Sequence, residues 1–419
     1  MKRRSAIALI VVVVLVLATA LALRWAMRPQ TLGPRVLDMA GQALGLEISA
    51  GTFDYRLRGS PQLVARDVSA RVPGADTPLV EAERVFISLP WSTLRARGAD
   101  LTVTRIELDA PKVWLQPFLN WWSQRPAGDG RLPTLSDGLL VERGHVEGGD
   151  WSVRELGVDL PRFAPGERVR GAVRGRFRAQ AFEAPFDLRV TMTRPAAGAG
   201  IGIAGKASPQ AGDWRLSNRL VLSTRLDTPG PGTPGMQLLR LRLSSGSRYE
   251  SGDTAQAFAL GLAAEGLLSN GALALEPAAL ALRGQDLVPD LDGRGRLGYA
   301  QSLALELAGN IREWPESWPA LPPPMGESDE PMPFHLAYSG PANLSVPLRL
   351  ELQREQARFE GSLRIAEVTS WFGAIDSDTP LPPLDGRLAA ARIEISGAQL
   401  EGVVVEFEDE PAAAPTPAP

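Results

Sequence analysis

Apolar and polar residues alternate along most of the chain from residue 47 onward, as they do between Phe53 and Leu57. Successive side chains of a β-strand point to opposite faces, so this period of two predicts strands with one apolar and one solvated face. The longest alternating stretch runs from Leu344 to Leu352. Because Pro347 has no amide proton to donate, we place this strand at a sheet edge or a bulge. The pattern predicts a mainly β body.

A helical period precedes the strands. Val36, Leu37 and Leu44 recur at helical spacing, Pro34 suits the first helical turn, and Gly45 suits the left-handed position at a helix end. These residues predict a short amphipathic helix over 31–45.

The strand-rich body is expected to span residues 46–407, with internal breaks near 125–138, 228–235 and 318–333, and a Pro/Ala-rich tail over 408–419 is predicted to be disordered. Leu-Asp-Gly-Arg occurs at 291–294 and again at 384–387, each time before an alternating segment. Asp-Gly is a common hairpin turn, so we interpret each copy as a turn that feeds a strand. A repeat of only four residues also arises by chance in a chain rich in Leu and Arg.

The N-terminus carries the longest apolar run, from Ala6 to Leu23, with no charged residue, Gly or Pro. As a helix its eighteen residues measure about 27 Å, close to the hydrocarbon thickness of a bilayer. The basic flank 1–5 holds Lys2, Arg3 and Arg4, and Arg24 and Trp25 follow the run. Cytoplasmic flanks retain positive charge, so we expect an uncleaved anchor over 6–23 with a cytoplasmic N-terminus and an exported body. The alternative is a cleaved signal peptide, since Ala20-Leu21-Ala22 has the form of a cleavage site.

Composition excludes several classes of function. The net charge of −4 gives no electrostatic footprint for nucleic acid. The chain has no cysteine, which excludes disulfides, thiolate metal sites and cysteine nucleophiles. Its two histidines, His145 and His335, stand apart in the sequence, and neither belongs to a metal-ligand or triad pattern. We therefore expect no enzyme, no cofactor and no metal site.

Two further clusters have competing interpretations. The arginines of 168–178 suit anionic lipid head groups, but they alternate with apolar residues and equally suit the solvated face of a strand. Trp121 and Trp122, with Trp114 and Phe118 nearby, suit a membrane surface, although core packing or a groove lining is at least as good an explanation.

The order of several degenerate motifs carries a family resemblance. The apolar run and a short helix ending in Ala-Leu-Gly-Leu at 43–46 are followed by Gly-Thr-Phe-Asp-Tyr-Arg-Leu at 51–57, Pro-Leu-Val-Glu-Ala-Glu-Arg-Val at 78–85, Ile-Glu-Leu-Asp-Ala-Pro at 106–111 and Leu-Asp-Gly-Arg-Leu at 384–388. In this order they resemble the AsmA-like family of bacterial envelope proteins, most clearly over 1–116 and 384–407. The resemblance implies an elongated, curled antiparallel β-sheet in the periplasm, whose concave face is a hydrophobic groove, and a role in outer-membrane lipid homeostasis.

Together these features predict a single-pass inner-membrane protein with a periplasmic body that binds or handles lipid and supports outer-membrane assembly. The alternative is a bitopic scaffold or assembly factor of envelope or secretion machinery, in which the apolar faces form a closed core. Expected partners are the inner membrane, phospholipid or lipopolysaccharide, and envelope proteins, with no nucleic acid. The expected groove lining is Phe334, Leu336, Tyr338, Val346, Leu348 and Leu350.

Overall fold

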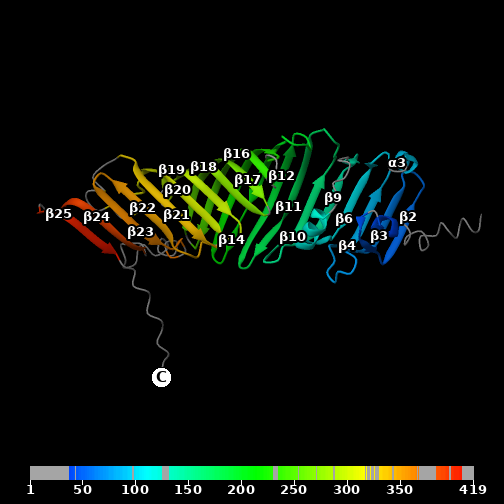
Figure 1. Ribbon diagram of the computed structural model, residues 1–419, viewed down its shortest axis with the longest axis horizontal. Helices are drawn as coiled ribbons and strands as arrows, with labels where there is room; N and C mark the ends of the chain where they lie inside the picture. Colours follow the sequence, from blue (N-terminus) through cyan, green and yellow to red (C-terminus); the bar gives the residue numbers. More distant parts are fainter. Residues whose placement is uncertain are drawn as a thin grey trace, which may run out of the picture. The chain divides into compact units, whose positions relative to one another are not determined.

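The computed structural model describes residues 37–407, apart from 43, 97–98, 125–131, 230–234, 253, 270, 286–287, 317, 319–320, 322–324, 326–329, 342–343, 366, 368–383 and 396–397. The chain divides into two compact units, Met1–Pro195 and Ala196–Pro419. Both units are built mainly from β-strands (Figure 1), which confirms the predicted class.

The expected anchor over 6–23 lies outside the described residues, as do its flanks, the first part of the 31–45 helix and the tail 408–419. Residues 37–42 and Leu44 are helical, so the described part of the predicted helix has the expected structure. No helix within the described ranges is long and apolar enough to cross a bilayer.

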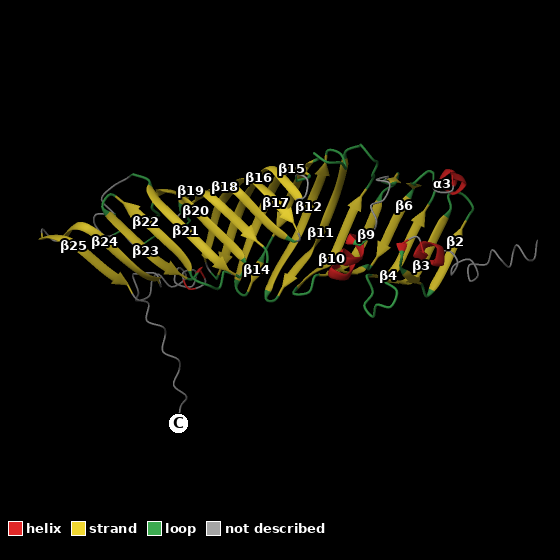
Figure 2. Ribbon diagram, viewed as in Figure 1, coloured by secondary structure: helices red, strands yellow, loops and turns green. Residues whose placement is uncertain are grey.

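The first unit contains one principal sheet. β3 (Gln62–Arg71) pairs on one side with β1 (Glu47–Ser49) and β2 (Thr52–Arg56), and on the other side with β4 (Val80–Ser88). β4 pairs with β6 (Arg105–Asp109) and β7 (Lys112–Trp114), and the sheet continues through β9 (Leu139–Glu147), β10 (Trp151–Leu160), β11 (Val169–Ala179) and β12 (Phe182–Met192). Helix α3 (Trp91–Ala96) follows β4, and both are labelled in Figure 2.

This sheet is mixed, which corrects the expectation of a purely antiparallel sheet. β9 runs parallel to β6 and β7, and the two-residue strands β5 (Thr102–Val103) and β8 (Thr134–Leu135) also pair in parallel. Parallel neighbours need a long crossover connection, and helix α4 (Leu115–Ser123) lies in the connection from β7 to β9. The 115–123 stretch alternates too little to predict a strand, and it has no capping side chain or terminal charge that would predict a helix.

The second unit is an antiparallel meander. Its strands are β13 (Gly200–Ala207), β14 (Gln210–Ala211), β15 (Trp214–Asp227), β16 (Met236–Ser251), β17 (Thr254–Ser269), β18 (Ala272–Gly284), β19 (Asp290–Tyr299), β20 (Leu303–Glu313), β21 (Met332–Gly340), β22 (Leu348–Arg354), β23 (Ala357–Leu363), β24 (Leu384–Ile395) and β25 (Ala398–Phe407). β13 and β14 both pair with β15, and from there each strand pairs with the next along the chain (Figure 1). Sequential pairing of this kind needs only short hairpin connections.

Bulges interrupt the regular pairing at several places, and two of them lie in strands β16 and β18. In β16, Leu239 and Arg240 stand opposite the single residue Glu265 of β17, and Arg240 has a φ of 52°. In β18, Glu276 and Pro277 stand opposite Glu265 on one side and opposite Arg296 of β19 on the other. A bulge bends its strand and increases the local twist. Because the bulges align across neighbouring strands, they place a continuous line of bending across the sheet.

The two Leu-Asp-Gly-Arg copies lie inside strands, so their interpretation as turns was wrong. Gly293 belongs to β19 and Gly386 to β24. A Cβ atom on Gly293 would lie 3.2 Å from the ring of Phe334, and one on Gly386 would lie 2.8 Å from the ring of Phe359. Each glycine therefore leaves room for an aromatic ring that covers the strand.

The strand expected over 344–352 is shorter than predicted. β22 begins only at Leu348, because Leu344 has a φ of 57° and its amide donates to the carbonyl of Pro341 at 3.1 Å in a turn. Val346 and Pro347 precede the strand, and Val346 is 39% exposed. The chain turns directly after β22, since Arg354 of β22 pairs with Ala357 of β23.

Candidate functional site

One row of apolar side chains crosses the second unit from strand to strand. Ile203 of β13 is paired with Leu222 of β15, and the row continues through Leu243, Leu262 and Leu280 of the next three strands. Directly paired residues point to the same face of a sheet. We call these five residues the leucine row. Beyond Leu280 the same register line passes through Gly293, Gly309, Phe334, Leu352, Phe359 and Leu388.

Burial changes along this line. All five members of the leucine row are only half-buried. The nearby buried cluster contains just Leu241, Ala264, Leu275 and Ala278, which adjoin the line of bulges. Farther along, Phe334, Leu352 and Leu388 are 6%, 5% and 3% exposed. The face is thus partly open over β13–β18 and closed over β21–β24.

The closed part is covered by residues that follow β20. Met325 and Met332 are each 1% exposed, and Trp314 and Leu321 pack against the same cluster. Arg354 donates from Nη1 to the carbonyl of Met325 at 2.6 Å and from Nη2 to the carbonyl of Glu330. These hydrogen bonds hold the covering segment by its backbone, so the closure is specific and does not rest on apolar contact alone.

The expected groove residues lie mainly in the closed part. Phe334 belongs to the buried cluster, and Leu336 and Leu350 pack against it. Tyr338 and Leu348 are buried at 4% and 7% exposure. Tyr338 donates from its hydroxyl to the carbonyl of Pro341 at 2.6 Å. Tyr338 and Val346 also line a cavity of about 840 Å³ between β18 and β23, together with Leu275, Leu297 and Leu305.

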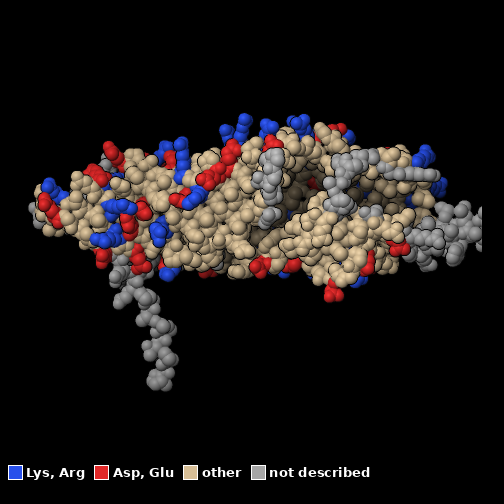
Figure 3. Space-filling view, in the orientation of Figure 1, with Lys and Arg blue, Asp and Glu red and all other residues tan. Residues whose placement is uncertain are grey.

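The opposite face of the same strands carries paired charges. Arg296 of β19 bonds Glu306 of β20 at 2.5 Å, and Arg358 of β23 bonds Glu351 of β22 at 3.1 Å. His335 lies between the two carboxylates, 3.6 Å from Glu306 and 3.9 Å from Glu351. Figure 3 shows side chains of both signs interspersed over this part of the surface. Such a ladder is typical of a solvated strand face.

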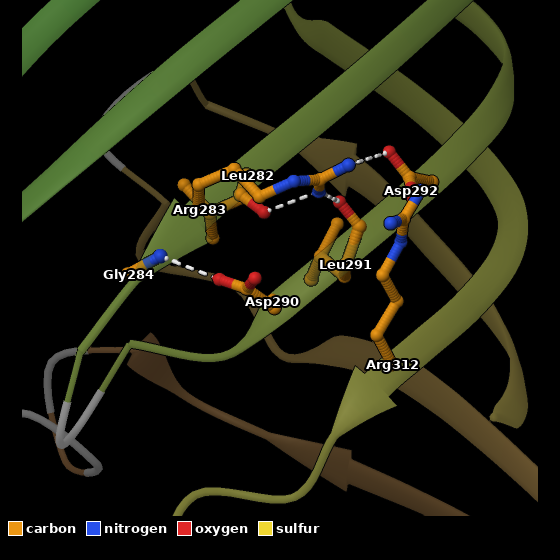
Figure 4. A network of polar contacts seen from close by, with 7 residues as sticks. All are labelled: Leu282, Arg283, Gly284, Asp290, Leu291, Asp292 and Arg312. Carbon is orange, nitrogen blue, oxygen red and sulfur yellow. Dashed lines mark hydrogen bonds and ion pairs between the residues drawn. The ribbon is translucent and has the colours of Figure 1, made fainter. Parts of the chain in front are cut away.

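A second charged network joins β18, β19 and β20 (Figure 4). Asp292 accepts from Arg283 at 2.6 Å and from Arg312 at 2.5 Å, while Arg283 also donates to the carbonyls of Leu282 and Leu291 at 2.8 Å. The hydrogen bond from Arg283 holds the pKa of the Asp292 carboxyl below its usual value, against a smaller opposing effect of burial, and Arg312 lowers this pKa further. All polar groups here are engaged with one another, so the network suits a structural role.

A cavity of about 890 Å³ at the ends of β13 and β15–β19 is rich in positive charge. Lys206, Arg219, Arg248 and Arg283 line it together with Asp290. Lys206 and Arg219 are direct cross-strand partners, an arrangement that is unfavourable for like charges. They alternate with residues of the leucine-row face and therefore point to the other side of the sheet. Two of these cations are already paired, Arg248 with Glu250 and Arg283 with Asp292. The cavity also contacts Asn218, Ser247 and Phe258, which lie on the leucine-row face.

The remaining candidate residues are held in local pairs. His145 Nε2 lies 2.9 Å from Glu147 Oε2. Arg178 of the basic run bonds Glu183 at 2.7 Å, and Arg176 bonds the same carboxylate. These hydrogen bonds, first that from Arg176, lower the pKa of Glu183. Within the described ranges no three His, Asp or Glu side chains are grouped to hold a metal ion.

Sequence reasoning missed the leucine row because each strand contributes only one of its members. The available signal was the recurrence of Leu-x-Leu segments, including Leu220–Leu222, Leu260–Leu262 and Leu280–Leu282, but pairing register is needed to align them. No family model matches this chain, and neither the curated proteins nor the solved structures contain a match.

Proposed function

We propose that the protein is a membrane-anchored lipid-handling protein of the cell envelope, which shields acyl chains on the leucine row. The observation that supports this proposal is the change of burial along one register line, from half-buried leucines over β13–β18 to a closed core over β21–β24. The mechanism is stoichiometric binding without bond chemistry. The AsmA-like resemblance points in the same direction and implies a periplasmic body.

The dimensions of the leucine row suit one acyl chain. Its five strands are separated by four spacings of about 4.8 Å, giving a length of about 19 Å. One leaflet contributes roughly 15 Å of hydrocarbon to a bilayer core of about 30 Å. Each methylene group buried there is worth roughly 0.8 kcal/mol before the cost of ordering the ligand is subtracted.

The closed core favours a second candidate. Over β21–β24 the apolar face is filled by the protein's own Met325 and Met332, as a scaffold with no lipid ligand requires. In this alternative the leucine row is the less deeply buried end of an ordinary hydrophobic core. The two candidates therefore differ in whether lipid reaches Leu222, Leu243 and Leu262.

Photo-crosslinking separates the two candidates on adjacent residues. A photoreactive amino acid is introduced at 222, 243 or 262 of the full chain in its native membrane, with matched controls at the outward positions 221, 244 and 263. Val221 is the strictest control, since it is 53% exposed and next to Leu222. Lipid adducts confined to the three inward positions support the lipid-handling function. Equal labelling of both sets, or none, contradicts it and favours the scaffold.

The topology is tested separately. A reporter that is active only in the periplasm, fused after Phe407, should be active, and the protein should resist carbonate extraction. Release of a soluble form that begins near Leu23 would show that the apolar run is a cleaved signal peptide.

A further inference from the structure

Helix α4 (Leu115–Ser123) presents an apolar surface that the described residues do not bury. Its sequence, Leu-Gln-Pro-Phe-Leu-Asn-Trp-Trp-Ser, has no charged residue, and none of its residues is buried. Trp122 is 60% exposed and Leu119 is 46% exposed. These two are three residues apart and therefore share one side of the helix. An uncharged helix with an exposed tryptophan and leucine resembles segments that lie in the plane of a membrane surface.

The polar residues of α4 form a stripe that borders the apolar side. Gln116 and Asn120 are one helical turn apart, and Gln116 Nε2 donates to Asn120 Oδ1 at 3.0 Å. Both side chains are exposed. The helix is therefore amphipathic, with a neutral polar side and an apolar side that is not turned fully into the protein.

The aromatic residues of α4 form a preorganised group. The ring of Phe118 lies 5.5 Å from that of Trp121 and 6.3 Å from that of Trp122, with the second pair stacked. Trp121 donates from Nε1 to the carbonyl of Leu44 at 3.1 Å. Trp121 thus joins α4 to Leu44, while Trp122 is left on the exposed side. Aromatic rings that are already ordered lose little entropy when they contact a surface.

The hydrogen bond to Leu44 connects α4 with the apolar N-terminal run. Only thirteen residues separate Leu23, the last residue of that run, from Leu37, the first described residue. If Ala6–Leu23 crosses a bilayer, residue 37 is at most about 50 Å of extended chain from the membrane surface. α4 is therefore tethered within reach of the surface to which the anchor belongs.

We propose that α4 lies in the interfacial layer of that same bilayer, with Trp122 and Leu119 inserted between the lipid head groups. This inference rests on the anchor of the proposed function but not on the leucine row. The second contact fixes the orientation of the first unit on the membrane, because a single anchor allows rotation whereas an anchor and an interfacial helix together do not. Indole rings favour this zone since they combine a large apolar surface with one hydrogen-bond donor.

The natural absence of cysteine makes a direct test possible. Single cysteines at 119 and 122 of the full chain are spin-labelled in phospholipid nanodiscs, and collision with oxygen is compared with collision with a water-soluble nickel chelate. The controls are Asn120→Cys, on the polar side of α4, and Val221→Cys, in the second unit. Labels at 119 and 122 should favour oxygen, and labels at 120 and 221 should favour the nickel chelate. The variant labelled at 119 retains Trp122, so its collision measurement is not affected by loss of the indole ring.

Flotation of the same proteins with the lipid distinguishes the possible failures. Proteins that float but carry water-accessible labels at 119 and 122 would overturn the α4 proposal and leave the anchor intact. Proteins that fail to float would overturn the anchor and the α4 proposal together. Labels at 119 and 122 that are shielded from both reagents, with dipolar broadening between molecules, would show that a second copy of the chain covers α4, which also overturns the proposal.

Discussion

Placing an arginine at two points on one register line tests whether the apolar face is open at one end and closed at the other. Leu352→Arg places the charge in the closed part, where Leu352 is 5% exposed and is paired with Phe334 and Phe359. Leu222→Arg makes the same change in the leucine row, where the side chain is half-buried. The chemistry of the substitution is identical, so any difference in the loss of stability reflects how deeply each position is buried.

The expected magnitudes differ several-fold. Truncating a buried leucine costs about 2–5 kcal/mol, and an unpaired buried charge costs about 3–5 kcal/mol. Leu352→Arg should therefore destabilise the second unit by about 4 kcal/mol or more, or prevent it from folding. At position 222 a long side chain can lie along the open face and place its guanidinium in water. The loss there should be about 1 kcal/mol, roughly half the value of burying a leucine.

Urea denaturation of the full chain in mild detergent, followed by the protease sensitivity of fragments from the second unit, measures both effects. Leu352→Met and Leu222→Met serve as volume-matched controls, and each should cost less than about 1.5 kcal/mol. Equal destabilisation by the two arginine variants would refute the division into open and closed parts. A larger loss of stability at 222 than at 352 would mean that the leucine row is the closed part of the face.

Three further predictions follow from individual residues. His145→Ala combined with His335→Ala should leave lipid capture near the wild-type level, and loss of capture in a folded, membrane-inserted protein would reveal a role for one of them. Asp292→Asn should lower stability by up to about 1 kcal/mol, as for a partly exposed ion pair. Because the folded-state pKa of Asp292 is depressed, this difference should be constant above about pH 5 and shrink as the pH falls below about 4, which urea midpoints measured against pH will show. Gly386→Ala should destabilise by about 1–3 kcal/mol, since its Cβ would lie 2.8 Å from an aromatic ring carbon, whereas Gly246→Ala meets nothing within 4 Å and should be neutral; equal midpoints for the two would contradict this packing.

The class of the fold could be predicted from period-two alternation because that pattern is local. The parallel pairing of β9 with β6 and β7 could not, since it depends on a crossover through α4 whose short helix has no charged residue and no capping side chain. The start of β22 was misplaced for a similar reason. Alternation continues through Val346, but the backbone turn at Leu344 ends the regular pairing.

The bulges of β16 and β18 are visible in the sequence as a break in the period-two alternation. Apolar positions step by three from Leu238 to Leu241 in β16 and from Leu275 to Ala278 in β18, and in each case the extra residue returns the side chain to the same face. The covering of the apolar face has no such signal. Leu352 is buried in one cluster with Met325, which belongs to no alternating segment.

The placement of the bulges has a consequence for how such a chain can change in length over evolution. β16 and β18 are bulged while β17 and β19 are not, so the bend recurs once in each of the two hairpins β16–β17 and β18–β19. Duplicating one bulged strand with its regular partner would preserve both the direction of bending and the side on which the leucines point. Adding a single strand would break that order. The leucine row can therefore lengthen in steps of two strands, about 10 Å each, and accommodate longer apolar partners without redesign of the strands already present.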